Sequence, residues 1–135
     1  STEPLALQSE LHPHRPRLTL NIGITGHRAA VLPDDLNRKV AAVLERLFDR
    51  IRCNAERLHA EEALLFAPDA PVLRLHTPLA TGADQAAASS ARAAGFAVRA
   101  LLPFRQDEYG NDFAAGRERE EFARQLDLAD EVFAL

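Results

Sequence analysis

Cysteine, methionine and tryptophan are nearly missing from this sequence of 135 residues, which has one cysteine, Cys53, and neither of the other two. A single cysteine can form neither an internal disulfide nor a cysteine-based zinc cage, which fits a reducing compartment such as the cytoplasm. Because methionine is missing, we do not expect residue 1 to be the natural translation start. We expect no metal site, since His12 and His14 have no carboxylate or thiolate at a spacing that would complete one.

Long apolar runs and an excess of basic residues are missing as well. No segment approaches the roughly 20 continuous apolar residues of a membrane span, and the N-terminus has no apolar signal core. The formal net charge of -4 argues against a general attraction to nucleic acid, because binding of the phosphate backbone usually requires a basic excess. We therefore expect a cytoplasmic protein that has no membrane contact and for which nucleic acid is a disfavoured partner.

The length of the chain allows one domain with one ordinary core. Residues 1–17 contain three prolines and no regular periodicity, so they are expected to form an N-terminal tail, followed by one domain over residues 18–135. Residues 131–135 have the pattern of a strand, and a doubly wound sheet normally continues from such a strand into a helix. The sequence is therefore interpreted as the N-terminal part of a longer protein.

Strand and helix patterns alternate along this domain. Strands are predicted over residues 18–25, 72–77, 96–102 and 131–135. Helices are predicted over residues 34–58, where the continuation to residue 62 is either helix or a separate turn, and over residues 83–94 and 117–126. Residues 104–116 are expected to form a loop or lid. The alternation predicts an α/β fold with a Rossmann-like parallel sheet of at least four strands, flanked by helices.

Two loops at the carboxyl ends of the predicted strands carry the candidate ligand-binding residues. Ligands of such sheets bind at this edge, where helix N-termini expose unpaired amides. The first loop combines glycines with a hydroxyl, an imidazole and a guanidinium, in Gly23, Thr25, Gly26, His27 and Arg28. The second loop leads into a helix and contains Pro78, Leu79, Ala80, Thr81, Gly82, Ala83 and Asp84.

Individual roles follow from the chemistry of these side chains. Thr81 is expected to cap the helix, and the amides of Gly82 and Ala83 would point at an anion. Asp84 has two open interpretations: it complements the helix dipole, or it accepts a hydrogen bond from a ribose hydroxyl or from Arg28 in the opposing loop. In the lid, Phe104 or Tyr109 is expected to cover a base.

Two common nucleotide motifs are not present. The NAD fingerprint needs three glycines and an acid at the end of the second strand, whereas this sequence has Gly23 and Gly26 and ends that strand with His76 and Thr77. No G-x-x-x-x-G-K-[ST] sequence occurs, which excludes a P-loop ATPase at the level of motif. Because the NAD fingerprint is incomplete, a dinucleotide dehydrogenase is disfavoured.

The two loops together resemble the SLOG superfamily, Rossmann-like domains related to the cytokinin-activating LOG proteins and to the DNA-processing protein DprA. The resemblance spans residues 18–135 and rests on Gly26-His27-Arg28, residues 78–84, Leu102-Pro103-Phe104, Glu108-Tyr109 and Asp112-Phe113. It implies a pocket for a nucleotide or a nucleotide derivative, with no other cofactor required. Bacterial members are often proposed to be sensors joined to effector domains, so the resemblance implies ligand sensing that regulates a C-terminal effector.

The departures from these relatives define the alternatives. LOG enzymes hydrolyse an N-glycosidic bond and use the pattern P-G-G-x-G-T-x-x-E. When this pattern is aligned with residues 78–86, Ala86 stands at the position of the catalytic glutamate. A LOG-like hydrolase, in which Asp84 would be the acid or nucleophile, is therefore the alternative to a binding module. The run Gly82-Ala83-Asp84 resembles the DprA-like branch, but no basic stripe with stacking aromatics supports single-stranded DNA binding. A pure assembly module that forms a homodimer through an apolar patch on the long helix is the last alternative.

Overall fold

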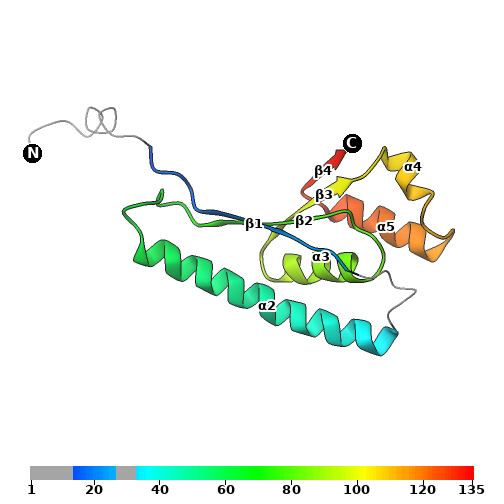
Figure 1. Cartoon of the computed structure of the whole chain (residues 1–135), viewed down its shortest axis with the longest axis horizontal. Coiled ribbons are helices and arrows are strands. Elements are labelled where there is room, and N and C mark those ends of the chain that lie inside the picture. The colour runs from blue at the N-terminus through cyan, green and yellow to red at the C-terminus, as the bar shows by residue number, and fades with distance from the viewer. Residues whose placement is uncertain (1–13, 27–32) are drawn as a thin grey trace, which may run out of the picture.

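The computed structural model describes residues 14–26 and 33–135, and in these ranges it has four strands and four helices (Figure 1). In chain order they are β1 (Thr19–Gly23), α2 (Asp34–Glu61), β2 (Val72–Thr77), α3 (Ala83–Ala93), β3 (Ala97–Leu102), α4 (Gln106–Gly110), α5 (Arg117–Leu128) and β4 (Glu131–Ala134). The strands lie in the order β1-β2-β3-β4, and every neighbouring pair is parallel. The predicted α/β class and the Rossmann-like parallel sheet are confirmed.

The three longer helices, α2, α3 and α5, lie on the same face of this sheet (Figure 1). A strand order that advances in one direction, joined by right-handed crossovers, places every connecting helix on one side. Burial alternates accordingly along β2, where Leu73, Leu75 and Thr77 are buried and the residues between them are partly exposed. In the described part of the chain, helices therefore cover one face of the sheet and leave the other uncovered.

The core fills the space between the sheet and these helices. The alanines of α3 that face it, Ala87, Ala88 and Ala91, are fully buried, and their small side chains allow α2 to approach closely. Phe48 of α2 packs on Phe96 before β3, with ring centroids 5.1 Å apart. The small side chains of α3 therefore set how closely this helix packs in the core.

The structure refines several boundaries. The long helix α2 is continuous to Glu61, and the predicted lid contains the short helix α4 because Tyr109 turns inward against the rings of Phe113 and Phe122. The last residues of the expected tail are held in place: Arg17 Nε donates to the carbonyl oxygen of Ala70 at 2.8 Å. Residues 1–13 lie outside the described part.

Four large apolar side chains of α2 are exposed, namely Leu36, Val43, Leu47 and Leu58. The apolar patch on this helix and dimerisation through it stay predictions. No helix in the described ranges is long and apolar enough to cross a membrane.

Candidate functional site

The two glycine-containing loops meet at the carboxyl edge of the sheet. Gly26 follows β1, and Ala83 is the first residue of α3 after β2. A Cβ atom placed on Gly26 would lie only 2.5 Å from the Cβ of Ala83, so a larger residue at either position would force the loops apart. Because β1 and β2 are neighbouring parallel strands, their carboxyl ends lie side by side, which brings these two loops into contact.

Helix α3 begins without a side-chain cap. Its N-cap residue is Gly82, which has φ 91° and ψ -124° and supplies no acceptor to the first amides of the helix. The prediction that Thr81 caps this helix is wrong. The N-cap position has a positive φ, which favours glycine, and Gly82 occupies it. The amides and the positive dipole end of α3 favour an anion at this point.

Side chains within the second loop hold its backbone in place. The Leu79 N–H donates to Thr77 Oγ1 at 3.1 Å, and Gln85 Nε2 donates to the Leu79 carbonyl at 3.0 Å. Leu79 is fully buried and has φ 57°, a left-handed conformation that is rare for a branched side chain. Such strain persists only where surrounding contacts determine the backbone, and here these contacts are the hydrogen bonds from Leu79 and Gln85 and the burial of Leu79.

Asp84 also contacts the backbone of the second loop. Its side chain is buried, and its Oδ2 accepts a hydrogen bond from the Ala80 N–H at 3.3 Å. The residue lies in the first turn of α3, where a carboxylate also complements the helix dipole. These contacts agree with the first interpretation, in which Asp84 complements the helix dipole. The second, in which it accepts a hydrogen bond from a ribose hydroxyl or from Arg28, stays a prediction.

A cavity of about 320 Å³ opens beside the second loop. It lies between the start of α3 and the start of α5, and its lining residues are Thr81, Gly82, Gln85, Arg117, Glu118 and Glu121. Like α3, α5 begins at a glycine, Gly116, with φ 81° and no side-chain cap. Two helix N-termini and the Arg117 guanidinium therefore adjoin one cavity.

The two acidic residues of this cavity are engaged with the protein. Glu118 Oε2 accepts from the Ala114 N–H at 3.2 Å. Glu121 accepts from Arg124 at 2.7 Å and from Gln125 at 2.9 Å, and the hydrogen bond from Arg124 holds the pKa of Glu121 below its usual value. Their negative charges are thus partly compensated.

Sequence reasoning missed Gln85 and Arg117. Gln85 braces the loop from inside α3, and Arg117 comes from an element remote in sequence. Gly116, directly before a helical pattern, was the available signal for a second uncapped helix start at this edge.

The two aromatic candidates differ in exposure. Tyr109 is 3% exposed, and its ring is enclosed edge-on by Phe104, Phe113 and Phe122 at centroid distances of 5.3–5.8 Å. It packs as a core residue. Phe104 is 42% exposed, so of the two it is the ring that can contact a bound base.

The remaining candidates are spread along the loops. Thr25 is exposed next to Gly26, while Pro78 and Ala80 are half-buried beside Leu79. Gly23 ends β1, and nothing lies within 4 Å of the place where its Cβ would be. His27 and Arg28 lie outside the described residues.

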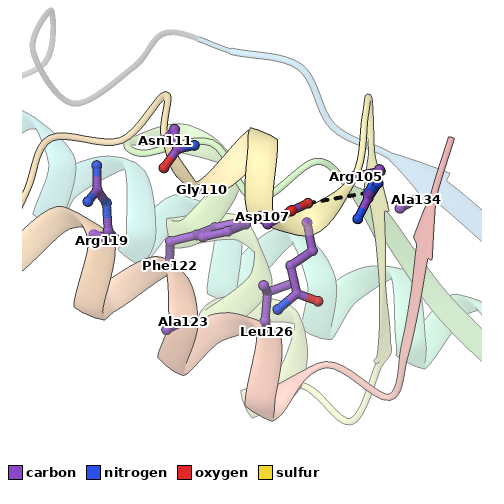
Figure 2. Close-up of a pocket in the computed structure, with 10 residues that line it drawn as sticks. Arg105, Asp107, Gly110, Asn111, Arg119, Phe122, Ala123, Leu126 and Ala134 are labelled. Atoms are coloured by element: carbon purple, nitrogen blue, oxygen red, sulfur yellow. Dashed lines mark ion pairs between the residues drawn. The ribbon is translucent and has the colours of Figure 1, made fainter.

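A larger cavity lies on the other flank of α5. It has a volume of about 600 Å³, and Figure 2 shows Phe122 and Leu126 of α5 facing α4, with an ion pair of 3.5 Å between Arg105 and Asp107 at its rim. Both partners of that pair are exposed, so it adds little stability. The cavity contains none of the residues predicted from the sequence. The smaller cavity is the stronger candidate site, because the second predicted loop and the starts of α3 and α5 line it.

Comparisons with known proteins identify no relative. No family model matches the chain, and neither the curated proteins nor the solved structures include a significant match. Within the described residues, no three histidine, cysteine, aspartate or glutamate side chains are grouped so that they could hold a metal ion. The resemblance to the SLOG superfamily thus remains an interpretation of the two loop motifs.

Proposed function

We propose that this domain binds a nucleotide or a nucleotide derivative through its phosphate, at the carboxyl edge of the sheet. The observation that carries the proposal is the contact between Gly26 and Ala83 at the uncapped N-terminus of α3. A helix start without a side-chain cap offers N–H donors and a positive dipole to an anion, worth about 0.3–1 kcal/mol at an exposed site. The bare backbone at Gly26 lets the first loop approach the same anion.

Further groups at this edge supply charge and a stacking surface. Arg117 adjoins the cavity and can bind a phosphate with two parallel hydrogen bonds. In this proposal His27 and Arg28 of the first loop add to that charge. Phe104 follows β3 and exposes its ring, which would pack on a base. The cavity volume of about 320 Å³ is at the lower end of the range for small-molecule sites.

The contacts of Asp84 support binding over hydrolysis. An acid or nucleophile must reach the reacting bond, whereas the Asp84 carboxylate is buried and braces the loop through Ala80. Ala86 occupies the position at which the LOG resemblance requires glutamate. The proposed role is therefore that of a sensor, in which the bound ligand regulates a linked effector domain.

The test is a thermal-shift and calorimetric screen over mono-, di-, cyclic and ADP-ribose-type nucleotides at millimolar concentration. A ligand present at 100 times its Kd adds about 2.7 kcal/mol to the free energy of unfolding, which is readily detected as a rise in Tm. If no nucleotide of the panel raises Tm, the proposal is wrong.

Two glycines of the first strand and loop provide a matched pair of variants. Gly26→Ala should remove most of the ligand-induced rise in Tm, because its new methyl group collides with Ala83. Gly23→Ala should retain the rise although Gly23 is among the candidate residues of the first loop, because its Cβ would meet nothing within 4 Å and would leave the contact between Gly26 and Ala83 unchanged. Arg117→Ala, on the surface of α5, should weaken binding about tenfold without unfolding the domain. If Gly26→Ala and Arg117→Ala both bind the ligand as tightly as the unchanged chain does, the proposed location is wrong.

A further inference from the structure

The uncovered face of the sheet has an ordered set of side chains. Strand register aligns Gly23, His76, Arg99 and Glu131 in one row across all four strands. Arg74 lies two residues before His76 on β2 and points to the same face. These residues come from strands, so the sheet itself fixes their positions.

Basic groups predominate on this face. Arg99 Nη2 donates to Glu131 Oε1 at 3.0 Å, and its guanidinium lies 5.7 Å from the ring centroid of Phe133. Arg74 has no ion pair with any residue in the described ranges. The three basic side chains Arg74, His76 and Arg99 thus share this face with one carboxylate, that of Glu131, in a chain whose net charge is negative.

An apolar area borders the basic one. Leu101 of β3 and Phe133 of β4 are register partners, and they are 43% and 48% exposed. Parallel sheets occur almost only with both faces covered, and the covering elements are helices. A face that is basic at its centre and apolar at one side therefore fits a helix with carboxylates and aliphatic side chains along one stripe.

We propose that the uncovered face is a docking surface for an acidic amphipathic helix of a partner protein. Its carboxylates lie opposite Arg74 and Arg99, and its aliphatic side chains cover Leu101 and Phe133. A second copy of this chain fits poorly, because a two-fold contact of this face with itself would bring together two identical surfaces on which basic side chains predominate. The proposal does not depend on the nucleotide site, which lies at the edge of the sheet.

The test is an NMR titration of the ¹⁵N-labelled chain with a helix-forming peptide that has glutamates and leucines along one stripe. A matched peptide with lysines in place of the glutamates is the control. We expect the glutamate peptide alone to shift the amide signals of Arg74, His76, Arg99, Leu101 and Phe133. Arg74→Glu should weaken this binding about tenfold or more, while Arg46→Glu, an exposed change on α2, should leave it unchanged.

Three outcomes would overturn the inference. The first is equal binding of the two peptides, and the second is an unchanged affinity in Arg74→Glu. The third is a concentration-dependent shift of the same signals without peptide, which would identify a second copy as the occupant. Dispersed NMR spectra and far-UV circular dichroism of both variants establish that a lost interaction does not arise from unfolding.

Discussion

The guanidinium of Arg92 donates to Gln125 Oε1 at 2.8 Å and to the Gln125 carbonyl at 3.3 Å, which joins α3 to α5. Gln125 is almost fully buried, and its amide also donates to Glu121. Burial lowers the pKa of Arg92 from its ordinary value, so this charge depends on its partner for solvation. The pair holds together the two helices whose starts line the smaller cavity.

Truncating this glutamine should destabilise the domain. Gln125→Ala removes the acceptor of a partly buried charge and leaves a void, so the free energy of unfolding should fall by about 2–4 kcal/mol. Gln106→Ala, an exposed change on α4, should alter it by about 0.5 kcal/mol or less. Urea denaturation measures both values. Equal small losses would mean that the Arg92–Gln125 contact does not stabilise the fold.

The left-handed backbone at Leu79 predicts a difference between two otherwise similar variants. Leu75 and Leu79 are both fully buried, but Leu75 lies in β2 and Leu79 has φ 57°. Leu75→Val should cost about 1 kcal/mol for one lost methylene. Leu79→Val should cost about 1–2 kcal/mol more, because a β-branched side chain fits a positive φ poorly. Equal losses in chemical denaturation would show that the backbone at residue 79 is not strained.

His76 should make stability depend on pH. Desolvation, followed by the nearby charges of Arg99 and Arg74, lowers the pKa of His76 from its ordinary value of 6.5. The unfolded chain therefore binds more protons than the folded one between the two pKa values, so stability falls as pH decreases through this window. His76→Gln should flatten the dependence on the acid side of pH 6.5. Denaturation series at several pH values measure the slope.

The same histidine can be titrated directly by NMR. Arg74→Ala should raise the pKa of His76 toward its ordinary value, because one repelling charge is removed. An unchanged pKa in this variant would mean that Arg74 does not act on the ring.

The hydrogen bond from the Ala80 N–H to the buried Asp84 carboxylate predicts that Asp84 does not act as the acid or nucleophile of a hydrolase. Incubation with a full panel of nucleoside monophosphates should release no free base, as measured by liquid chromatography. Asp84→Asn should lower stability, because the Ala80 amide loses a charged acceptor. Base release that disappears in Asp84→Asn would favour the LOG-like alternative instead.

Most of the fold could be predicted from the sequence because its signals are local. In β2, Leu73 and Leu75 alternate with Arg74 and His76, and the structure buries the first pair and exposes the second in part. Helix α4 could not be predicted, because its burial depends on Phe122, a residue of another helix. The cap of α3 was assigned to Thr81 because side-chain chemistry alone favours threonine, whereas the backbone conformation at Gly82 decides it.

The candidate site was predictable only in part. The meeting of Gly26 with Ala83 follows from the adjacency of parallel strands, which the alternating pattern already indicated. Arg117 was missed because its proximity to Thr81 depends on how α5 packs against α3, and that packing uses the contact between Arg92 and Gln125. Long-range side-chain contacts of this kind leave no periodic signal in a sequence.

The close approach of Gly26 to Ala83 leaves room for one methyl group between the two loops. The side chain of Ala83 supplies this methyl group now, and an alanine at position 26 could supply it instead. The double variant Gly26→Ala with Ala83→Gly should therefore recover stability that Gly26→Ala alone loses, and a double-mutant cycle would measure the coupling. Positions 26 and 83 would then be free to change only together.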